Sequence, residues 1–148
     1  MAELTELEQV LPQEIEKRSF EIITQELGDR VLDEKQAPVI KRVIHTTADF
    51  DYADNLVFSP NVMELAWQAI REGAPIITDT NMGKSGINKK RLANYGSEVY
   101  CFMADEDVAE EARKHGITRA CASMDKAARL GLNGIFAIGN APTALVRL

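Results

Sequence analysis

The chain has 148 residues, of which 45% are hydrophobic and 27% charged, and its formal net charge is −6 at pH 7. This length and composition are typical of a single globular domain, and the acidic balance argues against a general nucleic-acid-binding protein. No apolar run reaches the length of a membrane-spanning helix and the start of the chain is acidic and polar, so we expect a cytoplasmic protein with no membrane partner.

A first helix is predicted from Pro12 to Leu27. Its apolar positions share one face, and a glycine suited to the C-cap follows them: Ile15, Ile22, Ile23, Leu27 and then Gly28. Ser19 falls inside this apolar stripe and Arg18 lies at its edge. A polar side chain that faces inward must find a partner or line a cavity, so both residues are candidates for a binding site. The alternative is a serine that is hydrogen-bonded to its own helix.

A charged connection leads to a second predicted helix, from Val39 to Thr47, with Pro38 in its first turn. Polar residues end this helix and three acids follow it: His45, Thr46 and Thr47, then Asp49, Asp51 and Asp54. The helix dipole and the carboxylates both favour the imidazolium form of His45, and histidine titrates near neutral pH. His45 is therefore a candidate proton donor; the alternative is an inert histidine in a helix cap.

A helix from Val62 to Arg71 and a buried strand from Ala74 to Thr78 are predicted next. The strand runs into a loop, residues 79–86, whose candidate binding residues are Thr80, Asn81, Met82 and Lys84. Open parallel sheets bind ligands just beyond the carboxyl ends of their strands, so this loop is a candidate site.

The helix after this loop carries Lys89, Lys90 and Arg91 in its first turn, where positive charge opposes the helix dipole. An anionic ligand would explain that placement, and a solvated basic face is the alternative. The loop has no Walker motif, so a nucleoside triphosphate is not expected.

Two further strand and helix cycles follow. Strands are predicted at residues 98–103 and 134–138, and helices at residues 108–115 and 118–130. The last strand ends in a small-residue loop with Gly139 and Asn140, and a helix starts near Ala144. Cys101 and Cys121 lie in apolar runs without metal-ligand spacing, so we expect buried free thiols and no metal site.

Three strand–loop–helix cycles predict an α/β fold of three layers, a mostly parallel sheet with helices on both faces, as in Rossmann-like proteins. Because the carboxyl ends of parallel strands meet at one edge, residues 79–86 and 139–143 should open on the same side of the sheet.

Four segments, in chain order, resemble a known family: IEKRSFEII, PVIKRVIHTTADFDYADNLVFSP, GAPIITDTNMGKSGINKKRL and GIFAIGNAPTAL. They are similar to the motifs of the precorrin-8X methylmutase family of cobalamin biosynthesis, also called cobalt-precorrin-8 methylmutases. The resemblance implies a homodimer, no redox or metal cofactor, and an isomerase that moves a methyl group between adjacent carbons at ring C of a corrinoid, giving hydrogenobyrinic or cobyrinic acid.

By the same resemblance, His45 is the catalytic acid that protonates a ring nitrogen. Residues of the matched motifs and the candidates above together form the expected substrate-binding set: Arg18, Ser19, Thr46, Thr47, Asp49, Thr80, Asn81, Met82, Lys84, Lys89, Gly139 and Asn140. Lysines and strand-end amides would bind the carboxylates of the substrate, and Asp49 or Asp51 would orient the imidazole.

Two other readings stay open: a non-catalytic module that binds the corrinoid product and passes it on, and a Rossmann-like domain for a phosphorylated ligand. The second is disfavoured because no GxGxxG pattern is present. Family members continue past GNAPTAL through at least one more strand and helix. We therefore expect one α/β domain over residues 1–148, with a helical segment at about 12–48 packed on it, that lacks the usual C-terminal strand–helix unit.

Overall fold

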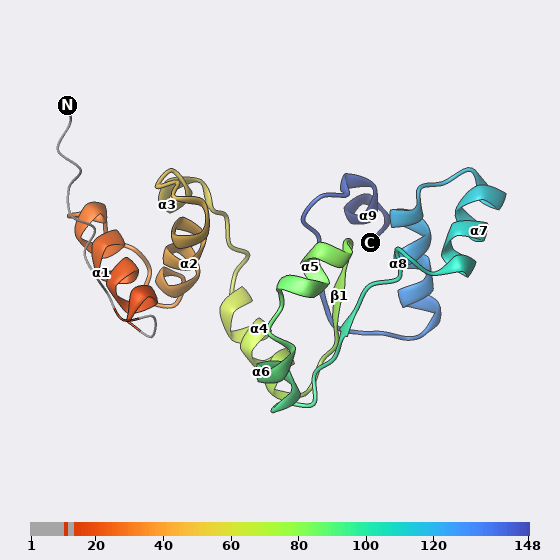
Figure 1. Ribbon diagram of the computed structural model, residues 1–148, viewed down its shortest axis with the longest axis horizontal. Coiled ribbons are helices and arrows are strands. Elements are labelled where there is room, and N and C mark those ends of the chain that lie inside the picture. Colours follow the sequence, from red (N-terminus) through yellow and green to blue (C-terminus); the bar gives the residue numbers. More distant parts are fainter. Residues whose placement is uncertain (1–10, 12–13) are drawn as a thin grey trace. The chain divides into compact units, whose positions relative to one another are not determined.

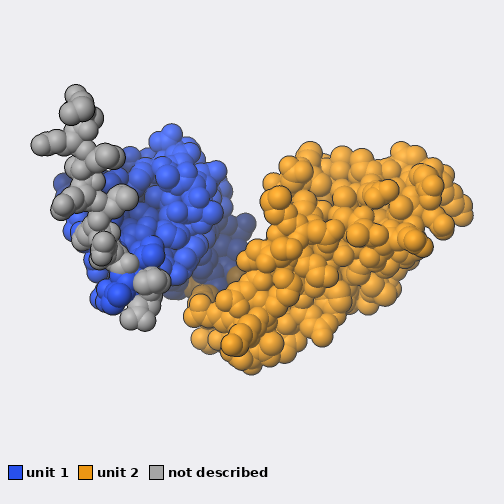
Figure 2. Space-filling model, viewed as in Figure 1, with its two compact units in different colours: residues 1–63 blue, residues 64–148 orange. Residues whose placement is uncertain are grey.

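The computed structural model describes residue 11 and residues 14–148. The chain divides into two compact units, residues 1–63 and residues 64–148 (Figure 2). Each unit has a hydrophobic core of its own. The expectation of one domain over residues 1–148, with residues 12–48 packed on it, stays a prediction.

The described part of the first unit contains α1 (Ile15–Leu27), α2 (Ala37–Thr47) and α3 (Tyr52–Asn55). The expected first and second helices are confirmed, while Pro12, expected in the first turn of α1, lies outside the described residues. Gly28 ends α1 in a positive-φ conformation, as a C-cap glycine does.

The two long helices of this unit, α1 and α2, lie side by side (Figure 1). Their apolar faces meet in a core built from Ile23, Leu27, Ile40 and Ile44. Full burial of such a side chain contributes about 1.5–3 kcal/mol, so this small core depends on each of the four. Phe50, Tyr52 and Phe58, from the segment after α2, pack against its side.

Helices and strands alternate in the second unit, and α4 begins at the end of the first unit. In chain order the elements are α4 (Val62–Arg71), β1 (Ile76–Thr78), α5 (Asn81–Gly86), α6 (Lys89–Ala93), β2 (Val99–Tyr100), α7 (Glu106–His115), α8 (Arg119–Arg129), β3 (Ile135–Ala137) and α9 (Pro142–Arg147). Each strand and helix predicted for this unit is present, and each of the three strands is shorter than predicted.

The sheet has three parallel strands in the order β2-β1-β3. Ile77 on the central strand belongs to the core formed with α7, α8 and α9. Thr78 follows it and therefore points to the opposite face, where α5 packs on β1. Helices thus cover both faces of a parallel sheet, which confirms the predicted α/β class.

The sequence-based expectation differs from the structure at residues 79–86 and at one cysteine. The predicted loop contains the short helix α5, because the hydroxyl of Thr80 accepts a hydrogen bond from the N–H of Gly83 at 3.0 Å and caps it. Both cysteines are free thiols, but only Cys101 is buried; Cys121 is half-buried. None of the helices in the described residues is long and apolar enough to cross a bilayer.

Candidate functional site

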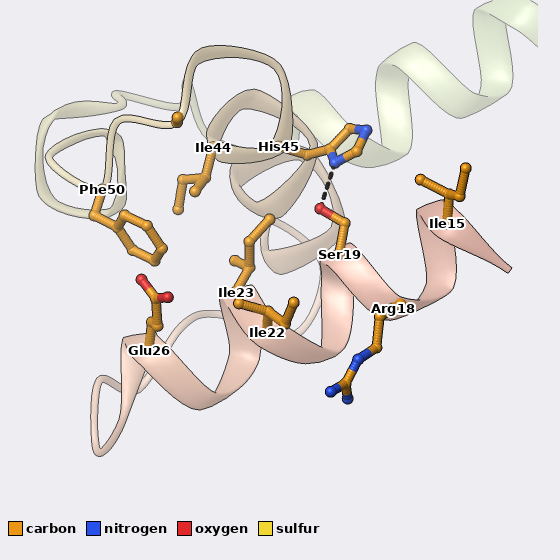
Figure 3. Close-up of a pocket in the computed structure, with 10 residues that line it drawn as sticks. Ile15, Arg18, Ser19, Ile22, Ile23, Glu26, Ile44, His45 and Phe50 are labelled. Carbon is orange, nitrogen blue, oxygen red and sulfur yellow. Dashed lines mark hydrogen bonds between the residues drawn. The ribbon is translucent and has the colours of Figure 1, made fainter. Parts of the chain in front are cut away.

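A pocket of about 530 Å³ lies in the first unit, against α1, the end of α2 and the segment after it. Its walls are mostly apolar and ten residues line it: Ile15, Arg18, Ser19, Ile22, Ile23, Glu26, Ile44, His45, Ala48 and Phe50. Ser19 and His45 point toward one another in it, and Glu26 lies toward the C-terminal end of α1 (Figure 3). The structure thus brings Arg18, Ser19 and His45 together from two helices.

His45 is held by a hydrogen bond between its Nδ1 and the hydroxyl of Ser19, at 2.7 Å. A hydroxyl can donate or accept, so Ser19 can serve either tautomer of the ring. Among the described residues only Nδ1 has a hydrogen-bond partner, so Nε2 is left without one. The imidazole is therefore oriented through one of its two nitrogens.

Phe20 fixes the plane of the imidazole. Its ring stacks on that of His45 with centroids 5.5 Å apart and an interplanar angle of 20°. The guanidinium of Arg42 lies over the Phe20 ring, 4.8 Å from its centroid, and pairs with Glu16, which ties α2 to α1. Two consecutive residues of α1, Ser19 and Phe20, thus hold the ring from its edge and its face.

Three of the expected binding residues follow His45 closely, and their side chains form hydrogen bonds with the backbone of nearby residues. The hydroxyls of Thr46 and Thr47 donate to the carbonyls of Arg42 and Val43, one turn back, at 2.9 and 2.8 Å. Asp49 accepts a hydrogen bond from the N–H of Asp51 at 2.9 Å. The expectation that Asp49 or Asp51 orients the imidazole has no support in these contacts, because Ser19 is the partner of Nδ1.

The remaining expected residues lie in the second unit, around the strand ends. Thr80 caps α5, and the next two residues, Asn81 and Met82, are exposed. Lys84 in α5 is half-buried, and Lys89 is exposed in the first turn of α6. Among the described residues, none of the ion pairs involves these lysines, so their charges are available to an anion.

Gly139 and Asn140 follow β3, and their backbone N–H groups bind the carboxylate of Asp79, which follows β1. Burial raises the pKa of Asp79, but the hydrogen bonds from Asn140, Ala141 and Gly139 lower it by more, so the pKa lies below its usual value. The two strand-end segments therefore do meet at one edge of the sheet, as predicted, and a buried anion joins them.

Sequence reasoning missed four residues around these sites: Phe20, Ala48, Phe50 and Asp79. Phe20 directly follows Ser19, so the prediction of Ser19 as a binding residue could have pointed to it. Ala48 has a φ of 56°, which no sequence pattern indicates for an alanine. Asp79 had a usable signal, because an acid at the end of a buried strand needs hydrogen-bond donors, which a neighbouring strand end can supply.

Within the described residues, no three His, Cys, Asp or Glu side chains are grouped so that they could hold a metal ion. Fold and pocket together define an α/β protein in which a histidine, held by a serine and stacked on an aromatic ring, faces a mostly apolar pocket.

Comparison with known proteins gives a consistent result. The family model described as precorrin-8X methylmutase matches residues 14–148. The chain is 45% identical over 139 residues to the cobalt-precorrin-8 methylmutase of Priestia megaterium, covering 94% of this chain and 62% of that protein. It is 46% identical over 143 residues to the cobalt-precorrin-8 methylmutase of Salmonella typhimurium, covering 93% of this chain and 68% of that protein.

A solved structure agrees with these relatives. The precorrin-8x methyl mutase of Thermus thermophilus superposes with a TM-score of 0.82 at 39% identity, over 91% of this chain and 66% of that one. The chain belongs to the precorrin-8X methylmutase family. It spans 62% of the length of the Priestia megaterium relative, less than two thirds.

Proposed function

We propose that the chain is an isomerase of cobalamin biosynthesis that moves a methyl group between adjacent carbons at ring C of precorrin-8X or cobalt-precorrin-8. The product would be hydrogenobyrinic or cobyrinic acid. The main support for the proposal is the oriented imidazole. In a chain of this family, His45 lines a mostly apolar pocket and is held at Nδ1 by Ser19, and Nε2 has no hydrogen-bond partner among the described residues.

His45 acts as a general acid in this proposal. Its Nε2–H protonates a ring nitrogen of the substrate, which draws electrons from the conjugated system and eases the shift of the methyl group. One carbon–carbon bond to the methyl breaks while the bond to the neighbouring carbon forms, and the proton then returns to Nε2. The composition of the corrinoid is unchanged, so the reaction needs no second substrate.

The walls of the pocket support this chemistry. Ile22, Ile23, Ile44 and Phe50 line it with apolar surface, which keeps water away from a reactive protonated intermediate. Ser19 stays bonded to Nδ1 throughout, so the ring that gives up a proton at Nε2 keeps its orientation.

The substrate carries many carboxylates, and we propose that basic side chains, hydroxyls and side-chain amides of the chain bind them. The proposed substrate-binding residues are Arg18, Ser19, Thr46, Thr47 and Asp49 in the first unit, and Thr80, Asn81, Met82, Lys84, Lys89, Gly139 and Asn140 in the second. Ser19 acts through the imidazole that it holds, and Asp49, Met82 and Gly139 contact parts of the corrinoid other than its carboxylates. Lys84 and Lys89 are the strongest candidates for charge pairing, because none of the described ion pairs uses them.

We also propose a cytoplasmic homodimer, with α4 in the interface. Leu65 and Trp67 on that helix are 60% and 53% exposed, and aromatic side chains are enriched at such contacts. Light scattering of the purified chain tests the dimer, and Trp67→Ala should shift it toward the monomer. A monomeric wild-type chain would contradict this part of the proposal.

Turnover tests the assigned reaction. The chain is incubated with precorrin-8X and conversion is followed by visible absorbance, with His45→Ala as the variant and His115→Ala as the matched control. His115 is exposed in the last turn of α7 and is not among the residues that line the pocket, so its loss should leave the rate unchanged. His45→Ala should lose conversion while it still binds corrinoid.

Conversion at the wild-type rate by His45→Ala would refute the role of His45. Tight binding by the wild-type chain without conversion would favour the alternative, a module that binds the corrinoid product and passes it on.

A further inference from the structure

Asp79 is a buried carboxylate at the carboxyl end of the central strand β1. Its side chain is 1% exposed, although neither a lysine nor an arginine pairs with it in the described part of the chain. Backbone donors surround it instead: the N–H groups of Asn140 and Ala141 lie 2.8 Å from Oδ2, and that of Gly139 lies 3.2 Å from each oxygen. Three consecutive residues thus bind one anion.

This arrangement joins two neighbouring strand ends. Thr78 at the end of β1 pairs with Ala137 at the end of β3. Asp79 comes directly after Thr78, and Gly139 lies two residues after Ala137. Hydrogen bonds to a charged acceptor are stronger than those between neutral groups. The segment 139–141 has no regular secondary structure, so its conformation depends on this carboxylate.

The bonds also limit what the segment can offer to a ligand. The N–H groups of Gly139 and Asn140 already bind Asp79, so they cannot bind a carboxylate of the substrate. The side chain of Asn140 stays available, because the residue is exposed and its hydrogen bond to another described residue comes from its backbone N–H.

We propose that Asp79 is a positioning residue for substrate binding: it holds residues 139–141 so that the Asn140 amide, not the backbone, contacts the corrinoid. This inference rests on the proposed function, since the ligand is the one proposed above. Asp79 itself touches no substrate and acts through the segment that it holds.

A double-mutant cycle on corrinoid affinity tests the inference. Hydrogenobyrinic acid is titrated into wild type, Asp79→Ala, Asn140→Ala and the double variant. Each single variant should bind about tenfold more weakly, and the double variant should bind no more weakly than Asp79→Ala, because the Asn140 amide is already misplaced there. Asp107→Ala removes a carboxylate from an exposed ion pair of the same unit and should bind like wild type.

Rescue by sodium formate separates positioning from a general loss of structure. In Asp79→Ala, formate can occupy the vacated position against the three N–H groups, so it should restore affinity, whereas sodium chloride of equal ionic strength should not. If Asp79→Ala does not fold, Asp79→Asn takes its place, since it keeps the shape of the side chain and loses the charge; its affinity should fall in the same direction and be coupled to Asn140→Ala in the same way.

The outcomes distinguish this inference from the proposed function. A folded wild-type chain that binds no hydrogenobyrinic acid refutes both. Wild-type binding that is unchanged in Asp79→Ala and Asp79→Asn, or losses that add in the double variant, overturns the positioning role alone.

Discussion

Gly134 lies where the chain enters β3, against the start of the central strand. A Cβ at this position would be 2.1 Å from the carbonyl oxygen of Pro75, 2.9 Å from its Cγ and 3.0 Å from its carbonyl carbon. These are backbone and ring atoms that cannot rotate away. The next residue, Ile135, donates its N–H to the same Pro75 oxygen at 2.9 Å, so separating the strands to admit a methyl group also strains the sheet.

Gly134→Ala should therefore destabilise the chain. Overpacking lowers the free energy of unfolding by about 1–3 kcal/mol, and a contact this short with rigid atoms should cost about 3 kcal/mol. For a chain of this size that loss lowers the melting temperature by roughly 10 °C. Circular dichroism during heating measures it, with Gly86→Ala as the matched control, because a Cβ at Gly86 in α5 meets nothing within 4 Å.

The control should melt at or above the wild-type temperature, since alanine favours helix over glycine by about 1 kcal/mol. A Gly134→Ala chain that melts within about two degrees of wild type would refute the packing described at β1 and β3, because the strain assigned to this contact corresponds to several degrees.

Three further predictions concern the two sites and one ion pair. Ser19→Ala removes the hydroxyl at 2.7 Å from Nδ1 of His45, a bond that contributes about 1 kcal/mol, so kcat should fall about fivefold with KM nearly unchanged. Asp79 has a lowered pKa in the folded chain. Its contribution to the free energy of unfolding is therefore complete above the unfolded-state pKa of 3.8 and is lost as pH falls through the folded-state pKa. The free energy of unfolding measured with urea should fall in that pH window, and it should fall less steeply in Asp79→Asn. Arg147→Ala breaks the partly exposed pair with Asp125 and should cost less than about 1 kcal/mol, measured by urea unfolding.

Each of these has a result that contradicts it. A large rise in KM with unchanged kcat would show that Ser19 contacts substrate and does not orient the imidazole. Equal acid sensitivity of wild type and Asp79→Asn would mean that the buried carboxylate does not stabilise the fold. A loss of several kcal/mol in Arg147→Ala would show that the pair anchors α9 far more strongly than an exposed ion pair does.

The order of strands and helices could be predicted because it rests on local patterns. The apolar stripes of α1 and α2, the glycine at position 28 and the β-branched run before Thr78 each dictate one element. The short helix α5 was not predicted, because its six residues include two glycines and its start depends on one capping hydroxyl, that of Thr80.

The site was only partly predictable, since its geometry depends on distant contacts. Ser19 and His45 are 26 residues apart, and no sequence pattern fixes how the connection between α1 and α2 turns, so the 2.7 Å contact could not be predicted. The expected orienting acid stays a prediction without support in the contacts. Asp49 lies near His45 in sequence, but its carboxylate accepts a hydrogen bond from the N–H of Asp51, and the partner of Nδ1 is Ser19.

Binding of the corrinoid product at His45 is the most direct test of the proposed function. Hydrogenobyrinic acid is titrated into the purified chain and visible absorbance is recorded, beside His45→Ala and His115→Ala. We expect saturable binding with a spectral shift in the wild type and in His115→Ala, and loss of that shift in His45→Ala. A folded wild-type chain with no saturable binding, or an identical shift in all three proteins, would contradict it.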